Sequence, residues 1–211
     1  MKKISILIVV AVLSFGKVSA KTENFGTWIE LEFTKEFLKR FEFSIIPDFR
    51  FQDDFSLDKY QFDARLGYTP LDFLEVAAAY RIKTNVKNKE NEVTHRLVLD
   101  ATLKTDVGRF TPSFRTRFVT YNDVDGERVS VIRPRIKIEY DIKGSKIEPY
   151  TRYETYRDLV NNEFTGGRFD VGFTRKMGDL HRVGIYYRLQ HYYSGESNSI
   201  NIIGIDYRFK I

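Results

Sequence analysis

The stretch Phe41–Phe51 reads Phe-Glu-Phe-Ser-Ile-Ile-Pro-Asp-Phe-Arg-Phe and alternates apolar and polar residues. A period of two is typical of a β-strand, because successive side chains of a strand point to opposite faces of the sheet. The apolar positions are Phe41, Phe43, Ile45, Phe49 and Phe51, and the polar positions are Glu42, Ser44, Asp48 and Arg50. We therefore expect a strand with one apolar face and one charged face.

The same alternation recurs along the rest of the chain. Ten further segments begin near residues 28, 60, 74, 97, 110, 132, 147, 169, 183 and 203. Turn residues separate them, for example at positions 69–72 and 105–108. The pattern predicts an all-β protein with many strands joined by hairpins.

The N-terminus has the pattern of a secretory signal peptide. Lys2 and Lys3 precede an apolar run over residues 4–15, and Val18-Ser19-Ala20 supplies small residues for cleavage. The run is shorter than the ~20 residues of a spanning helix, which disfavours an uncleaved anchor. We expect residues 1–20 to be a signal peptide cleaved after Ala20. Residues 21–211 should then form one domain, since no linker interrupts the alternation.

Composition excludes several function classes. Removing Lys2, Lys3 and Lys17 leaves 34 − 3 = 31 basic against 29 acidic residues, so the net charge falls from +5 to +2. Nucleic-acid binding loses its compositional support, because it requires a basic surface. The chain has no cysteine, which excludes disulfides, thiolate metal sites and a cysteine nucleophile. We expect no cofactor and no nucleic-acid partner.

Alternation alone fits both a soluble barrel with an apolar interior and a membrane barrel with an apolar exterior. A soluble barrel of about eight strands has an interior just wide enough for side chains or one small ligand. The 18 Phe and 13 Tyr of this chain are too much apolar bulk for such an interior. The polar face, with Arg, Asp, Glu, Gln and Ser, suits a wet lumen. We therefore predict a transmembrane antiparallel up-and-down β-barrel of 10–12 strands.

The number of strands and the prolines test this prediction. Single-chain bacterial barrels have an even number of strands, whereas eleven segments alternate. We expect twelve strands if residues 21–25 add one, or ten if the segment at Trp28 or Ile147 is not a full strand. Pro47 and Pro134 lie deep in their strands. Because proline removes a ladder hydrogen bond, we expect β-bulges at both.

The connections alternate in expected length. Short ones lie at residues 69–72, 105–108, 142–146 and 177–180, and longer ones at 52–58, 84–92, 121–129, 158–166 and 193–199. Outer-membrane barrels combine short periplasmic turns with longer external loops. This assignment places the C-terminus in the periplasm.

Several short motifs resemble a known family. They are Gly26-Thr27-Trp28, Phe49-Arg50-Phe51, Tyr68-Thr69-Pro70-Leu71-Asp72-Phe73-Leu74, Gly108-Arg109-Phe110 and Phe114-Arg115-Thr116-Arg117-Phe118. They resemble DUF2490, a family of outer-membrane barrels of unknown function found mainly in Bacteroidetes. The resemblance extends over nearly the whole chain after the signal peptide, and it implies a location but no activity. The last strand also resembles the C-terminal assembly signal of outer-membrane proteins, with Tyr207, Phe209 and Ile211 in the signal positions.

The polar register gathers basic residues on two neighbouring strands: Arg115, Arg117, Arg133, Arg135 and Lys137. Charges enclosed in a barrel must be neutralised or must attract counter-ions. The candidate acidic partners are Asp100, Glu139, Glu148 and Glu154. Two interpretations remain open, an ion-paired network that fills a narrow lumen and an anion-selective constriction.

Membrane enzymes are the competing class. A phospholipase or acyltransferase would need a serine, a histidine and a polar orienting group on the outer surface. His95 lies on the outward register without a serine two or four residues away, and His191 has Ser194 nearby only in a loop. The loop at residues 122–127 does not have the ligand spacing of a calcium loop. We therefore predict no catalytic residue and no metal site.

The sequence thus predicts a narrow porin-like or structural envelope protein of the cell outer membrane. Its expected partners are membrane lipid, lipopolysaccharide, the barrel-assembly machinery and small anionic solutes. A lipid-modifying enzyme is the alternative, and a soluble periplasmic ligand-binding barrel is a more distant one.

Overall fold

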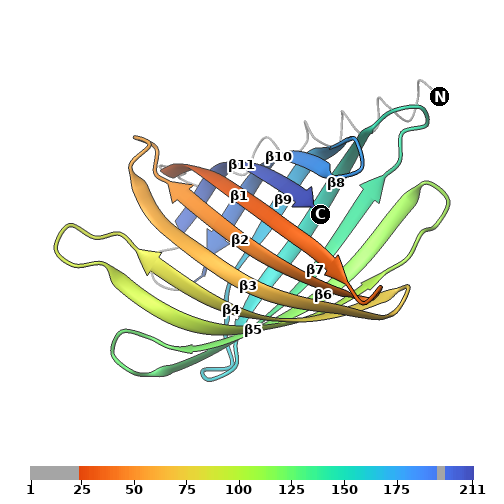
Figure 1. Ribbon diagram of the computed structural model, residues 1–211. Helices are drawn as coiled ribbons and strands as arrows, with labels where there is room; N and C mark the ends of the chain where they lie inside the picture. Colours follow the sequence, from red (N-terminus) through yellow and green to blue (C-terminus); the bar gives the residue numbers. More distant parts are fainter. Residues whose placement is uncertain (1–23, 194–197) are drawn as a thin grey trace.

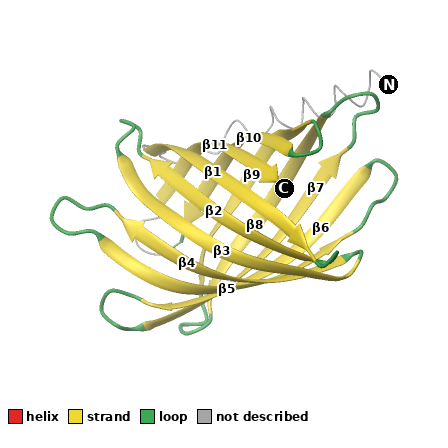
Figure 2. Ribbon diagram, in the orientation of Figure 1, coloured by secondary structure: helices red, strands yellow, loops and turns green. Residues whose placement is uncertain are grey.

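The computed structural model describes residues 24–193 and 198–211, which form a barrel of strands (Figures 1 and 2). The predicted signal peptide lies outside the described residues. The strands are β1 (Asn24–Phe37), β2 (Phe41–Phe51), β3 (Leu57–Leu71), β4 (Leu74–Asn85), β5 (Glu92–Lys104), β6 (Phe110–Asn122), β7 (Arg128–Tyr140), β8 (Ile147–Asp158), β9 (Phe164–Met177), β10 (His181–Tyr192) and β11 (Asn198–Lys210). No helix that could cross a membrane occurs in the described part of the chain.

The barrel has eleven strands within the described residues and is closed. Each strand pairs with its sequence neighbours in antiparallel fashion, and β1 pairs with β11 in parallel (Figure 1). Up-and-down strands alternate in direction, so the first and last of an odd number run the same way and can close only in parallel. The predicted all-β barrel and the range of 10–12 strands are confirmed, whereas the expectation of an even number is wrong.

Both segments whose status was open are full strands of the wall. The Trp28 segment is β1, which pairs with both β2 and β11. The Ile147 segment is β8, which pairs with both β7 and β9. Asn24 and Phe25 already belong to β1, so the proposed extra strand at residues 21–25 is not separate as far as it is described.

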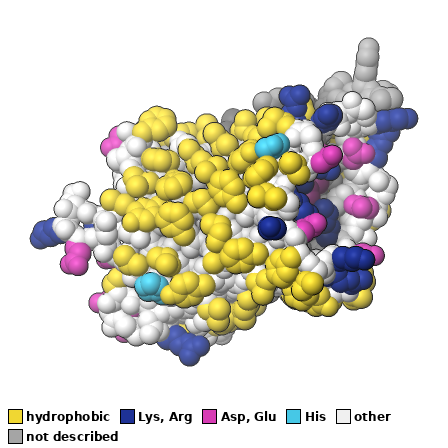
Figure 3. All heavy atoms as spheres, viewed as in Figure 1, with side chains coloured by type: hydrophobic (Ala, Val, Ile, Leu, Met, Phe, Trp, Pro, Cys, Tyr) yellow, Lys and Arg dark blue, Asp and Glu magenta, His cyan; other side chains and the backbone are white. Residues whose placement is uncertain are grey.

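Alternate side chains face out of and into the barrel, as the period of two requires. In β5, Leu97 and Leu99 are 46% and 42% exposed, while Val98 between them is 1% exposed. Among the described residues sixteen polar or charged side chains are buried and six apolar ones. The apolar face therefore points outward, and it covers much of the visible wall in Figure 3. An inward apolar face, which a soluble ligand-binding barrel requires, is contradicted.

The interior apolar core is correspondingly small. Ala79, Val98 and Val119 form its buried cluster, and Tyr121 packs against them. These residues come from β4, β5 and β6, which are consecutive in the wall. Most of the remaining interior is polar, so the arrangement of charges inside the barrel decides how the lumen is filled.

The prolines do not cause bulges, so this prediction is wrong. Pro47 pairs with Phe62 of β3 in unbroken register, and Pro134 pairs in the same way with Thr116 of β6. Each loses pairing with its other neighbour, because the ladder has a gap beside Pro47 towards β1 and beside Pro134 towards β8. The register is the same before and after each gap. A residue of an antiparallel ladder directs its backbone polar groups to one neighbour only, so proline disturbs one side and leaves the other intact.

The two ends of the barrel differ less than expected. One end, here called the turn end, carries the connections 38–40, 72–73, 105–109, 141–146 and 178–180. The other, the loop end, carries 52–56, 86–91, 123–127, 159–163 and a connection that includes residues 194–197, which are not described. The predicted long loops are shorter in the structure because strand pairing continues into their polar residues. At the turn end Gly144 and Gly178 have φ of 78° and 69°, which glycine adopts without strain.

An aromatic ring fixes the interior surface near the closure of the barrel. Tyr186 of β10 lies opposite Gly204 of β11 and covers it, so a Cβ at Gly204 would overlap the ring. The ring also lies under the guanidinium groups of Arg152 and Arg188, 4.8 and 4.6 Å from its centre. An aromatic ring over a glycine in the next strand pins the register of the pair.

Gly204→Ala should destabilise the barrel by about 1–3 kcal/mol, because the tyrosine ring must leave its position. The free energy of unfolding from urea titrations of the refolded protein measures this. Gly184→Ala is the matched control on the neighbouring strand, where the nearest atom to a new Cβ is the Thr174 Cγ2 at 3.3 Å. Equal losses for the two variants would contradict the role of Tyr186.

Candidate functional site

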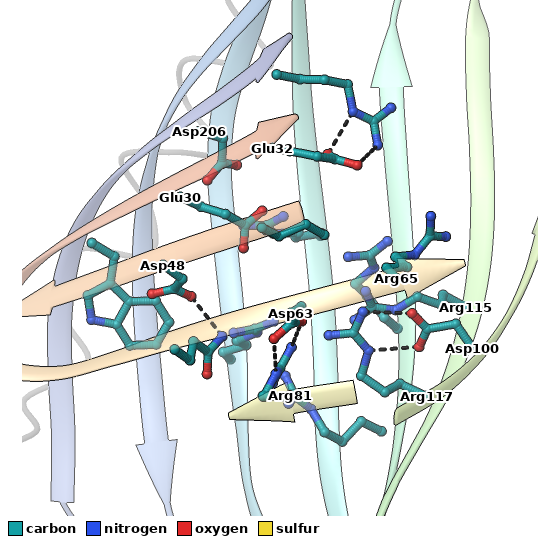
Figure 4. Close-up of a pocket in the computed structure, with 18 of the residues that line it drawn as sticks. Glu30, Glu32, Asp48, Asp63, Arg65, Arg81, Asp100, Arg115, Arg117 and Asp206 are labelled. Carbon is teal, nitrogen blue, oxygen red and sulfur yellow. Dashed lines mark hydrogen bonds and ion pairs between the residues drawn. The ribbon is translucent and has the colours of Figure 1, made fainter. Parts of the chain in front are cut away.

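The interior of the barrel holds a cavity of about 280 Å³. Its lining includes eleven arginines: Arg50, Arg65, Arg81, Arg115, Arg117, Arg133, Arg135, Arg152, Arg168, Arg188 and Arg208. It also includes seven acidic residues: Glu30, Glu32, Asp48, Asp63, Glu75, Asp100 and Asp206. Figure 4 shows a part of this lining. The site is therefore a small, highly charged chamber inside the barrel.

The predicted basic cluster divides into two parts. Arg115, Arg117, Arg133 and Arg135 line the cavity. Lys137 lies further towards the turn end of β7, where its Nζ donates to Glu139 at 2.8 Å. The register of β6 and β7 sets Arg115 directly opposite Arg135 and Arg117 directly opposite Arg133. Two arginine pairs thus lie next to each other on the inward face of β6 and β7. Like charges in such cross-strand positions repel each other.

Two carboxylates hold three of these four arginines. Asp100 accepts two hydrogen bonds of 2.7 Å from Arg117, in the bidentate geometry that arginine favours. Glu154 accepts from Arg115 at 2.8 Å and from Arg133 at 3.1 Å, and it forms an ion pair with Arg168 at 2.5 Å. The side chain of Glu154 is 0% exposed. One buried carboxylate is therefore shared by three arginines from three strands.

The other two predicted acidic residues lie nearer the turn end. Arg182 of β10 donates to Glu139 at 3.0 Å and to Glu148 at 2.6 Å. This arginine spans from β10 to β7, which are not neighbours in the wall. It was missing from the predicted set, although the alternation places it on the inward register.

Sequence reasoning also missed further ion pairs of the lining. Arg81 makes two bonds to Asp63 at 2.7 and 2.6 Å, and Arg188 makes two to Asp170 at 2.6 and 3.1 Å, with Arg152 also paired to Asp170. Arg208 donates to Glu32 at 2.7 and 2.6 Å. The alternation could have placed all these residues inside the barrel, because they share the inward register. It could not have predicted which residues pair, because that depends on the order and register of the strands.

Acidic residues gather on the opposite wall. The register sets Glu30 of β1 opposite Asp48 of β2 on one side and Asp206 of β11 on the other. Asp48 is hydrogen-bonded to Arg50 and Gln61, whereas Glu30 and Asp206 form no hydrogen bond or ion pair with the described residues. Figure 4 shows these acids on one side of the cavity, with Arg65, Arg115 and Arg117 on the other. The chamber therefore has an acidic wall and a basic wall.

The residues of the predicted assembly signal lie at the end of β11. The Tyr207 hydroxyl is 2.7 Å from His181 Nδ1, and the Phe209 ring stacks on the His181 ring at 4.9 Å. Ile211 follows the strand and is exposed. These contacts tie the last strand to β10 at the turn end.

The histidines include one pairing that the sequence did not suggest. His191 Nδ1 lies 2.7 Å from Ser199 Oγ, because these residues are directly opposite in the ladder of β10 and β11. His95 instead contacts the Tyr80 hydroxyl at 2.7 Å. A serine and a histidine at this distance can act as nucleophile and base. Ser199 is 4% exposed, however, so its hydroxyl is not presented to a substrate.

The acidic loops serve local structure. In the 123–127 loop the Asp123 carboxylate accepts from the backbone N–H of Asp125 and Glu127 at 3.0 and 2.9 Å. In the 52–56 loop the Ser56 N–H donates to Asp54 at 2.8 Å, and hydrogen bonds from Ser56 lower the pKa of that carboxyl. No group of His, Cys, Asp and Glu suited to a metal ion occurs in the described part of the chain.

The fold and interior define a class, a closed eleven-stranded barrel with an apolar exterior and an ion-paired, arginine-rich interior. The family model described as a protein of unknown function (DUF2490) matches residues 25–201. The chain therefore belongs to the DUF2490 family, as its motifs suggested. A comparison with curated proteins finds no match.

Glu154→Gln should destabilise the barrel by about 3–5 kcal/mol, because it leaves three arginines around a neutral side chain. Urea titration of the refolded protein measures the loss. Glu36→Gln is the control, since Glu36 pairs with Lys210 in an exposed ion pair at the turn end. It should cost at most about 1 kcal/mol. A change below 1 kcal/mol for Glu154→Gln would contradict the central role of this carboxylate.

Proposed function

We propose that this protein spans the outer membrane as a narrow barrel that lets small solutes pass and favours anions. The observation that carries the proposal is the combination of an apolar exterior with a charged cavity lined by more arginines than acids. A membrane barrel needs lipid-facing apolar residues and tolerates charge only in its lumen. Both faces of this wall meet that requirement.

The ends of the strands support a membrane position. Aromatic pairs at the turn end are Phe41–Tyr68 at 4.5 Å, Phe110–Tyr140 at 5.0 Å and His181–Phe209 at 4.9 Å. Pairs near the loop end are Tyr80–His95 at 5.9 Å and His191–Tyr193 at 4.9 Å. Amphipathic rings at both ends of an apolar band are typical of membrane interfaces. The band between them would lie in the hydrocarbon.

The proposal includes the cellular context. Residues 1–20 would direct export and be cleaved after Ala20, and residues 21–211 would form the outer-membrane domain. The barrel-assembly machinery would recognise the last strand through Tyr207, Phe209 and Ile211. Lipid and lipopolysaccharide would surround the wall, and the turn end would face the periplasm.

The size of the lumen limits what passes. Ion-paired arginines from β3, β4, β6 and β10 project into it, and the cavity between them measures about 280 Å³. Paired side chains held by bidentate bonds do not move aside freely. The lumen should therefore exclude large solutes and act on small ions through its charge.

Planar-bilayer recording tests this proposal. Purified protein should open channels of small conductance that pass chloride better than potassium, and the double variant Arg115→Gln, Arg133→Gln should lose most of this preference. Arg109→Gln, an exposed arginine in the 105–109 turn, removes one positive charge outside the lumen and should leave selectivity unchanged. If no channels open, the proposed passage of solutes is wrong and a structural role in the cell envelope is left.

Leu99→Arg tests the position in the membrane. Leu99 is on the outward face near the middle of β5, where an arginine in lipid should cost about 2–4 kcal/mol. Val124→Arg in the 123–127 loop is the control and should be close to neutral. The stability of protein folded into lipid vesicles is the measurement. Equal stability of both variants would place Leu99 outside the bilayer.

A lipid-modifying enzyme is the second candidate, favoured by the short distance between Ser199 and His191. We expect no hydrolysis of phospholipid vesicles, because Ser199 is buried. Hydrolysis by the purified protein that is lost in Ser199→Ala would reverse the order of the two candidates.

A further inference from the structure

We infer that the basic wall of the cavity is a binding site for a compact multivalent oxyanion, with Arg135 as its open position. The inference rests on the proposed function in one respect, since solutes must be able to enter the lumen. It adds a specific site and a class of ligand. The site comprises Arg115, Arg117, Arg133, Arg135 and Arg168, which line the cavity from β6, β7 and β9.

The charges of this wall are not balanced by the carboxylates that contact them. Arg115, Arg133 and Arg168 share Glu154, Arg117 pairs with Asp100, and Arg135 pairs with neither. Five positive charges therefore face two negative ones, which leaves three in excess. The next carboxylate on this wall, Asp170, is already shared by Arg152 and Arg188. Glu30 and Asp206, which have no ion-pair partner among the described residues, belong to the opposite wall. A mobile anion on the basic wall would neutralise the excess locally.

Hydrogen-bond donors of the wall remain available. Arg135 lies opposite Glu154 in the ladder, but that carboxylate is used by Arg115, Arg133 and Arg168. Arg135 forms no hydrogen bond or ion pair with any described residue. The buried Nε–H groups of Arg115 and Arg133 also make no hydrogen bond in the described part of the chain. The wall thus offers both excess charge and donors without acceptors.

The existing contacts indicate the shape of the ligand. Three guanidinium groups converge on the two oxygens of Glu154, which shows that this wall can surround an oxyanion. Planar guanidinium groups recognise carboxylate and phosphate oxygens through paired donors. A cavity of about 280 Å³ admits a phosphate or a small polycarboxylate but no lipid chain. We assign the ligand to compact oxyanions that carry two or more negative charges.

Inorganic phosphate is the probe, and calorimetric titration of the detergent-solubilised full barrel is the measurement. Wild-type protein should bind one phosphate at low ionic strength. Arg135→Gln should weaken binding at least about tenfold, the effect of losing a charged hydrogen-bond partner. Arg135→Lys should give an intermediate loss, because it keeps the charge but not the planar fork. Arg109→Gln, which removes an exposed arginine at the turn end, should bind as wild type.

Each outcome decides the inference. Equal affinity of Arg135→Gln and Arg109→Gln, or no binding to wild type, overturns it. Urea titration of each variant shows whether a loss of binding reflects unfolding, and Arg135→Lys retains the test if Arg135→Gln does not fold. Phosphate binding without channels in bilayers would contradict the proposed passage of solutes and support the binding site. Anion-selective channels with phosphate binding insensitive to Arg135 would support the passage and contradict the site.

Discussion

Closure of the sheet is the constraint on which the rest of this structure depends. Every strand pairs on both sides, including the parallel pair of β1 and β11, so the barrel has no free edge. Alternate residues must then face either outside or inside along all eleven strands. The hydrogen-bonding groups of the backbone find their partners in the neighbouring strands. Even Pro47 and Pro134 interrupt this pairing on one side only. A chain with this alternation therefore confines its charges to the enclosed side.

Because the charged side chains are enclosed in the barrel, they must neutralise one another. Glu154 is completely buried and is held by three arginines, while Asp100 holds one arginine in a bidentate pair. Buried charges are tolerated when they are paired and hydrogen-bonded. The pairs are not distributed evenly, because β6 and β7 place arginines opposite arginines and β1 places Glu30 between two aspartates. The same network that fills the interior thus gives it a basic and an acidic wall.

These two properties connect the fold to the proposed roles. The apolar exterior suits lipid, and the charged interior suits small ions rather than apolar ligands. The basic wall that favours the passage of anions can also bind one. Arg135 carries the same charge as its neighbours but has no carboxylate partner. The pair of Ser199 and His191 shows that a catalytic distance alone does not make a site, because the hydroxyl is buried.

The sequence by itself determined the strands, the two faces and the family, because a period of two is local and is repeated in every segment. It also predicted that Arg115, Arg117, Arg133 and Arg135 face the interior, because their inward register follows from the same alternation. Only the tertiary structure decided which charges meet. Arg208 and Glu32 lie at opposite ends of the chain and pair only because β11 closes against β1. The strand number, the effect of the prolines and the unpaired Arg135 depend likewise on register between strands, which alternation within one strand does not contain.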